Sequence, residues 1–165
     1  MSEPGWEIEG GYRIDVFAEQ DAVSGEDIIA LWLREGGLSL GEAQRRLTEV
    51  LLVVSDARGQ VVGVCTRYLH RNEQLRTDMW YVRGMVAAAH RRSSIGYWVS
   101  ISSRDYLSRR FVSGEDRRGI GVVYEIENHF LKHVYPMGYW EPNDFIFIGE
   151  TAAGQHVRVH YFPGA

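Results

Sequence analysis

The order of strand-like and helix-like segments constrains the fold of this chain more than any other feature of its sequence. Residues 11–18 alternate apolar and polar side chains, as a half-buried strand does. Two helical segments follow, and each begins with a capping-box pair, Ser24 with Asp27 and Ser39 with Glu42. The remaining segments complete the order β-α-α-β-β-β-α-β-α-β-β. This mixture predicts an α/β fold, of the kind also classed as α+β, with a mixed central sheet of about seven strands flanked by about four helices.

The later segments have recognisable boundaries. Residues 50–56 and 61–69 are apolar runs joined by a short turn, which predicts a hairpin. A third strand is expected over 75–89, with an irregularity at Gly84, and a helix over 94–110. Residues 119–128 predict a strand, and residues 129–135 predict a short helix that Pro136 ends. Residues 144–150 and 155–162 predict a closing hairpin.

Composition limits the class of protein. The formal net charge is −4, which disfavours a polycationic nucleic-acid binder. No apolar run approaches the roughly 20 residues of a membrane span, and the first residues lack the pattern of a signal peptide. We therefore expect a cytoplasmic protein without nucleic-acid or membrane partners, with a loose tail over residues 1–10 and a single domain over residues 11–165. Cys65, the only cysteine, is expected to be a buried structural thiol.

Arginine accounts for 17 of the 18 basic residues. We interpret most of this excess as genomic bias. Four of these arginines are predicted to lie on solvent faces: Arg13, Arg45, Arg58 and Arg158. Arg91 and Arg92 differ, because they stand at a strand-to-helix junction where a guanidinium fork assists anion binding.

That junction, residues 86–98, is the most informative stretch of the sequence. A strand that gives way to small and polar residues before a helix presents unpaired backbone N–H groups at the positive end of the helix dipole. Arg91, Ser94 and Gly96 form an R-x-x-S-x-G arrangement, in which the glycine lets a ligand approach the backbone and the serine caps the helix or binds an oxygen. The pattern is typical of an anion site, and an ordinary capped helix is the alternative.

The element order and the residues of this junction resemble the GNAT (GCN5-related) superfamily of N-acetyltransferases, whose shared motif is V-x-x-x-x-[RQ]-x-x-G-x-[GA]. Val86, Arg91 and Gly96 match that motif, and Ser94 replaces its first glycine. The resemblance spans residues 12–162 in element order and implies a GNAT-like fold whose junction backbone holds the pyrophosphate of acetyl-CoA. The residues that it assigns to cofactor binding are Met85, Val86, Arg91, Arg92, Ser93, Ser94, Ile95, Gly96, Tyr97 and Asn128.

A second stretch, residues 128–140, is similar to the segment after the fifth strand of that family. Asn128, Tyr135 and the pair Gly138-Tyr139 correspond, whereas Pro136 directly after the tyrosine departs from the pattern. The resemblance implies that Tyr135 protonates the departing CoA thiolate. A phenol with a reference pKa of about 10 is a suitable donor. A tyrosine that only packs a helix end is the alternative.

Acyl transfer to an amine also requires an oxyanion site and a base. The resemblance assigns the oxyanion to backbone N–H groups around Met85 and Val86. For the base we favour Glu125, because it lies deep in an apolar run where desolvation would raise the pKa of a carboxyl group. Glu127, on the same strand face, and Asp78 are the other candidates. Each is also open to interpretation as a surface carboxylate.

Two further patterns are interpreted structurally. His129 and His133 have the i, i+4 spacing of a metal pair, but no HExxH signature or evident third ligand accompanies them, so we predict no metal. Four tryptophans are interpreted as core residues, with an acceptor pocket as the alternative: Trp32, Trp80, Trp98 and Trp140.

These patterns together predict an acyl-CoA-dependent N-acyltransferase. Acetyl-CoA is the default donor, a small-molecule amine is the expected acceptor, and the amine attacks the thioester directly. The alternative, motivated by Ser94 and Pro136, is a non-catalytic GNAT-like module that binds acyl-CoA or a protein partner. The sequence leaves open the acceptor, the acyl chain and the oligomeric state, a homodimer included.

Overall fold

The computed structural model describes residues 5–165, which form two compact units. The first unit comprises the described residues up to Arg67 together with Gly84–Ser103, and the second comprises Tyr68–Arg83 and Arg104–Ala165. Three elements run from one unit into the other: β4 (Val61–Asn72), β5 (Thr77–Val86) and α3 (Ile95–Val112). The expectation of a single domain over residues 11–165 stays a prediction.

The strands of the first unit form an antiparallel array. β1 (Trp6–Ile8) pairs with β2 (Tyr12–Val16), β2 with β3 (Val50–Ser55), and β3 with β4. The expected loose tail is therefore wrong for Trp6–Ile8, which add an edge strand whose two apolar residues are half-buried while Glu7 is exposed. Residues 1–4 of that tail lie outside the described residues.

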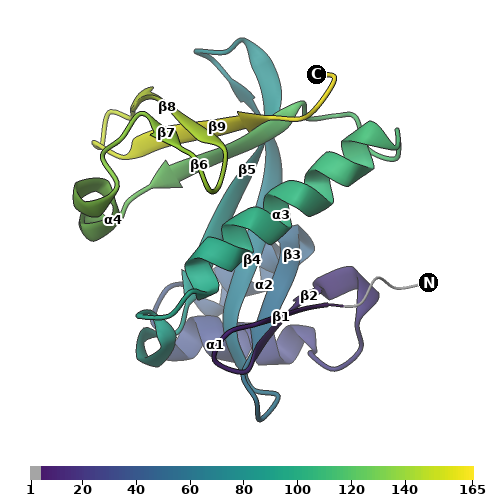
Figure 1. The fold of residues 1–165 in the computed structure, drawn as a ribbon. Coiled ribbons are helices and arrows are strands. Elements are labelled where there is room, and N and C mark those ends of the chain that lie inside the picture. Colours follow the sequence, from purple (N-terminus) through teal and green to yellow (C-terminus); the bar gives the residue numbers. More distant parts are fainter. Residues whose placement is uncertain (1–4) are drawn as a thin grey trace. The chain divides into compact units, whose positions relative to one another are not determined.

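The helical elements of the first unit besides α3 are α1 (Gly25–Arg34), α2 (Leu40–Arg46) and the short 3-10 turns Phe17–Glu19, Leu47–Glu49 and Ala88–His90. Both predicted capping boxes are confirmed: Ser24 and Asp27 cap α1, and Ser39 and Glu42 cap α2. α1 buries Ile28, which lies one turn from the buried Leu31 and Trp32. Figure 1 draws α1 and α2 behind β3 and β4, and the first turns of α3 in front of them.

The remaining elements of the second unit are β6 (Gly121–Ile126), α4 (His129–Val134), β7 (Tyr139–Trp140), β8 (Phe145–Glu150) and β9 (His156–Tyr161). β6 runs parallel to β5, with Tyr81 opposite Val123, and antiparallel to β9 along its whole length. Its core consists of Met79, Tyr81, Val123, Val157 and Val159. The first residue of β6, Gly121, has to be a glycine, because a Cβ at this position would collide with the backbone carbonyl of His160 on β9.

Along the sheet the strands follow the order β1-β2-β3-β4-β5-β6-β9-β8-β7. The predicted mixed α/β architecture is confirmed. The described residues contain nine strands where we predicted about seven. β1 and β7 were missed because segments of 3 and 2 residues are too short to carry a periodic signal. Within residues 5–165, none of the helices has both the length and the apolar character that a membrane crossing requires.

Candidate functional site

The predicted anion site lies in the first unit, where β5 ends and α3 begins. β5 ends at Val86, earlier than predicted, because Ala88–His90 form a 3-10 turn. The strand continues through Gly84, where a Cβ would meet only Val99 Cγ1, at 3.9 Å, so packing within the unit does not require a glycine. Met85 and Val86 are half-buried at the end of the strand.

The backbone of the junction is braced by its own side chains. The Ala87 N–H donates to the Val62 carbonyl at 2.7 Å, which ties the junction to β4. The Arg91 Nε donates to the Val86 carbonyl at 3.0 Å, so this guanidinium closes the turn from within. Arg92 is exposed. Arg91 therefore supports the shape of the junction as well as its positive charge.

The Ser93 side chain forms hydrogen bonds with the backbone on both sides of it, at the start of α3. Its hydroxyl donates to the His90 carbonyl at 2.6 Å and accepts from the Ile95 N–H at 3.3 Å. Ser94, for which the sequence offered this role, contributes its carbonyl, which accepts from the Trp98 N–H at 3.1 Å. The serine that matters for the helix start is thus the residue before the expected one.

The first turn of α3 faces open space. The N–H groups of Gly96 and Tyr97 precede the first intrahelical bond, so they have no carbonyl one turn back. Both residues are exposed, and a Cβ built on Gly96 meets no atom within 4 Å. The backbone of Gly96 is therefore accessible, and the chain itself does not need a glycine here. Oriented N–H groups at a helix start can bind an anion.

Glu35 belongs to the junction, although the sequence pattern gave no sign of it. Its Oε2 accepts from the Ala88 N–H at 2.9 Å and lies 4.0 Å from Arg91 Nη2. The carboxylate is 14% exposed. Tyr12 adds a second distant contact, because its hydroxyl lies 2.9 Å from His90 Nδ1. A negative charge therefore lies beside the proposed phosphate-binding residues.

Two of the candidate bases, Glu125 and Glu127, lie in the second unit, near the end of β6 and directly after it. Glu125 is exposed, so the expectation that it lies deep in an apolar environment is wrong: the apolar run of β6 stops at Val123 on that face. Burial and then the charges of Glu125 and Glu73 raise the pKa of the Tyr81 phenol, against the hydrogen bond from Asn72. The negative charge of Glu125 therefore contributes to the raised pKa of Tyr81 on the neighbouring strand β5.

The other two candidate bases are Glu127, which already accepts a hydrogen bond, and Asp78, which is exposed. Glu127 Oε1 accepts from Gln155 Nε2 at 3.0 Å, just before β9 begins. Asp78 lies at the start of β5 and is exposed, while its carbonyl accepts from the Ile120 N–H at 3.1 Å. All three candidate carboxylates belong to exposed residues, and Glu127 already accepts a hydrogen bond from a side chain.

Asn128 and Tyr135 stand at the two ends of α4. Asn128 is the N-cap, and its Oδ1 accepts from the N–H groups of Phe130 at 2.9 Å and Leu131 at 3.4 Å. Tyr135 is the C-cap, with its side chain 46% exposed and its ring edge-on to Trp140 at 5.9 Å. Because the side-chain oxygen Oδ1 of Asn128 is used in capping α4, the side-chain nitrogen Nδ2 is the group of this amide that is left for a ligand.

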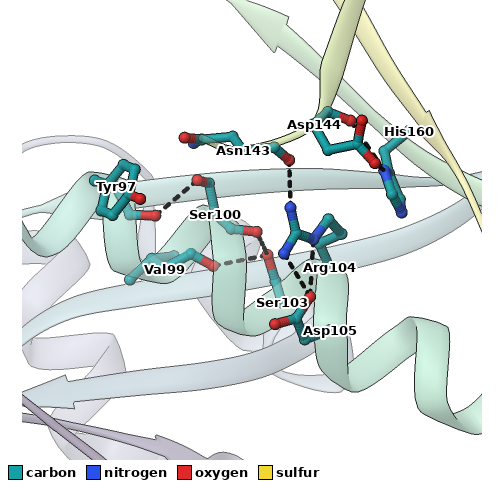
Figure 2. Close-up of polar contacts among 9 residues, drawn as sticks. All are labelled: Tyr97, Val99, Ser100, Ser103, Arg104, Asp105, Asn143, Asp144 and His160. Atoms are coloured by element: carbon teal, nitrogen blue, oxygen red, sulfur yellow. Dashed lines mark hydrogen bonds and ion pairs between the residues drawn. The ribbon is translucent and has the colours of Figure 1, made fainter. Parts of the chain in front are cut away.

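Side chains also fix the turn between β7 and β8. Arg104 of α3 donates to the Asn143 carbonyl and pairs with Asp105, and His160 Nδ1 lies 3.1 Å from Asp144 Oδ2 (Figure 2). The expectation that Arg158 lies on a solvent face is wrong. Its side chain is fully buried on β9, because the alternation of the strand places it on the face that the residues after α4 cover.

The remaining sequence interpretations have mixed outcomes. Trp32 and Trp80 are buried as expected, but Trp98 is 37% exposed. Cys65 is a buried free thiol, as predicted. His129 and His133 are both exposed on α4. Within residues 5–165 there is no group of three or more His, Cys, Asp or Glu side chains placed to hold a metal ion.

Comparison with known proteins identifies the fold. No family model and no curated protein matches the sequence. Among solved structures, a GCN5-related N-acetyltransferase from Kribbella flavida is 17% identical with a TM-score of 0.61, covering 92% of this chain and 98% of its own. The GNAT family N-acetyltransferase YhbS from Escherichia coli, solved with CoA, is 16% identical with a TM-score of 0.61, covering 94% of this chain and 84% of its own.

A eukaryotic structure gives the same result. NAA60 from Arabidopsis thaliana, solved with acetyl-CoA, is 11% identical with a TM-score of 0.63 and covers 92% of this chain and 99% of its own. The chain therefore has the fold of the GNAT acetyltransferases, as the junction motif predicted. Because a shared fold does not establish a shared reaction, the activity has to be argued from the residues described above.

Proposed function

We propose that this protein is an acyl-CoA-dependent N-acyltransferase that moves an acyl group, acetyl by default, from a thioester to the amine of a small molecule. The observation that carries the proposal is the open first turn of α3, where the backbone of Gly96 is accessible and the N–H groups of Gly96 and Tyr97 precede the first helical bond. Solved structures of the same fold contain CoA or acetyl-CoA, which supports this type of donor.

The proposed donor site uses both ends of the junction. Residues 91–97 hold the pyrophosphate through backbone N–H groups, aided by the positive charges of Arg91 and Arg92. The backbone N–H groups around Met85 and Val86 stabilise the oxyanion that forms on the thioester carbonyl. A well-placed N–H donor of this kind contributes about 3 kcal/mol to a transition state. Asn128 contributes its amide nitrogen.

The proposed reaction is a direct displacement. The amine nitrogen attacks the thioester carbonyl carbon, a C–N bond forms, and the C–S bond breaks as the tetrahedral intermediate collapses. Glu125 takes the proton that the attacking amine loses, with Glu127 as the second choice because Gln155 already occupies one of its oxygens. The Tyr135 phenol gives its proton to the departing thiolate, so the products are an amide and CoA thiol.

A second candidate is a module that binds acyl-CoA or a protein partner without catalysis. Glu35 favours it, since this carboxylate occupies the Ala88 N–H and places a negative charge next to Arg91. Ser94 and Pro136, which depart from the GNAT pattern, favour it as well.

Two measurements separate the candidates. Isothermal titration with CoA and with acetyl-CoA should show binding, and no binding at millimolar ligand would reject both CoA-dependent functions. Release of CoA thiol is then followed with a thiol reagent over a panel of small amines. The protein adds little background to this assay, because its single cysteine is buried. Binding without release by any amine would favour the non-catalytic module.

A further inference from the structure

Arg158 lies at the centre of β9, opposite Tyr124 on β6 and Phe147 on β8. Its side chain is fully buried, with 0% exposure. Burial lowers the pKa of its guanidinium from the ordinary value, and no nearby carboxylate opposes that effect. A buried charge is costly unless it is paired, so this position demands an explanation.

The neighbouring basic residues on the same face of β9 do have acidic partners. His156 Nε2 lies 3.2 Å from a Glu150 carboxylate oxygen, and His160 Nδ1 lies 3.1 Å from Asp144. For Arg158, the Nε and Nη1 atoms have no hydrogen-bond partner within residues 5–165. The guanidinium is therefore held by something other than an ion pair.

The contacts of Arg158 converge on the residues just after α4. Its Nη2 donates to the Tyr135 carbonyl at 3.1 Å and to the Met137 carbonyl at 2.8 Å. Its guanidinium carbon lies 3.8 Å from the centre of the Trp140 ring, a close cation–π contact. The Trp140 indole N–H donates to the same Tyr135 carbonyl at 3.0 Å.

These bonds fix a segment that would otherwise be poorly determined. The carbonyls at the end of a helix lack intrahelical partners, and Pro136 has no N–H with which to continue one. Arg158 and Trp140 satisfy the carbonyls of residues 135 and 137 instead. The backbone of Tyr135 is thus anchored from below while its side chain remains 46% exposed.

We propose that Arg158 is a positioning residue that, through the carbonyls of Tyr135 and Met137, holds the Tyr135 phenol in the orientation that protonates the CoA thiolate. The inference rests on the proposed acyltransferase function. The unpaired charge fits this role, because the planar guanidinium donates to two carbonyls while its flat face stacks on Trp140, a geometry that a tetrahedral ammonium group does not reproduce.

The test combines kinetics with a spectroscopic readout. Arg158→Lys, Tyr135→Phe and the double variant are compared for acetyl transfer from acetyl-CoA. We expect Arg158→Lys to lower kcat by about tenfold with less than about a twofold change in KM for acetyl-CoA, and to cause no further loss in the Tyr135→Phe background. An equal fractional loss in both backgrounds would show that Arg158 does not act through the phenol.

The matched control is Arg118→Lys. Arg118 also lies over a tryptophan, Trp80, at 5.2 Å and belongs to the same unit, but it pairs with Asp116 and contacts no residue of the proposed site. It should leave kcat within about twofold of the unmodified protein.

The second readout does not depend on turnover. The protein is labelled with 3-fluorotyrosine, and the signal of residue 135 is assigned as the one that Tyr135→Phe removes. Arg158→Lys should shift or broaden that signal, whereas Arg118→Lys should not. An unchanged signal overturns the positioning role. A changed signal without acetyl transfer to any amine rejects the proposed function and, with it, the catalytic purpose of the anchor.

Discussion

The two helix junctions that carry the proposed site are stabilised in opposite ways. The junction before α3 is braced by Arg91 and Ser93, which bond its own backbone, and it leaves the N–H groups of Gly96 and Tyr97 exposed. The residues after α4 are anchored by a buried guanidinium that lies 23 positions beyond Tyr135 and 21 beyond Met137, and they leave an aromatic side chain exposed. The first arrangement is suited to binding an anion, and the second to fixing the direction of one side chain.

The difference has an electrostatic side. A negative charge, Glu35, lies beside the N–H groups of the first junction, while an uncompensated positive charge, Arg158, lies beneath the carbonyls of the second. Each charge complements the backbone dipoles that it contacts. The negative charge of Glu35 opposes the binding of a phosphate, whereas the positive charge of Arg158 does not. Equivalent substitutions at the two junctions should therefore change CoA affinity to different extents.

The largest expected effect concerns Cys65, in the core of the first unit. Burial raises the pKa of its thiol to about 12, against a hydrogen bond from Ser103 that lowers it. Alkylation of the native protein at pH 8 should therefore be slower than alkylation in urea by at least about a thousandfold, since it requires unfolding. Fast alkylation of the native protein would mean that the core of the first unit around Cys65 opens readily.

The same pKa gives a pH dependence with a defined sign. The unfolded thiol ionises above about pH 8.5, whereas the folded thiol stays protonated until about pH 12. Its contribution to the free energy of unfolding is complete below that range and is lost as the pH rises through it. Cys65→Ala should show a shallower loss of stability over this range in urea titrations.

The next effect tests the openness of the first junction. Gly96→Ala should weaken CoA binding by about tenfold, equal to about 1.4 kcal/mol, because the new methyl group occupies the space that a phosphate needs. The variant should be as stable as the parent or about 0.5 kcal/mol more stable, since alanine is favoured over glycine in a helix. Titration calorimetry and thermal unfolding measure the two quantities.

The second junction offers the matched control. A Cβ at Gly138 also meets no atom within 4 Å, yet Gly138 lies after α4, so Gly138→Ala should leave CoA affinity unchanged. Equal weakening by both variants would contradict the assignment of the phosphate to the first junction. Ser94→Gly, which restores the glycine of the GNAT motif, should bind CoA at least as tightly as the parent.

The parts that sequence could predict are those whose signals are local. The caps Ser24 with Asp27 and Ser39 with Glu42 stand three residues apart, so their pattern is visible in the chain and the structure has both. The contact of Glu35 with Ala88 joins residues 53 positions apart, and no pattern announces it. Arg158 was misplaced for the same reason: alternation assigns a face to a strand residue but does not say what covers that face.

The next prediction concerns the N-cap of α4, at the start of the segment that leads to the second junction. Asn128 caps α4 through two backbone N–H groups, and Asn128→Ala should reduce the free energy of unfolding by about 1 kcal/mol. Asn128→Asp keeps the accepting oxygen and should retain most of that stability. Urea unfolding followed by tryptophan fluorescence measures the difference. Equal losses in both variants would mean that the amide nitrogen, and not the cap, is the important group.

The smallest effect tests the charge beside the first junction. Glu35→Gln keeps an oxygen that accepts from the Ala88 N–H but removes the negative charge, so CoA affinity should rise by about twofold to threefold at low salt. The gain should shrink only in part as salt is added, because surface charges are screened over about 10 Å at 0.1 M ionic strength, whereas this carboxylate, 14% exposed, is screened less. Glu7→Gln makes the same change in net charge on β1, outside the junction, and should have no such effect. Weaker binding in Glu35→Gln would instead show that the carboxylate helps the site by holding Arg91, whose Nη2 lies 4.0 Å away.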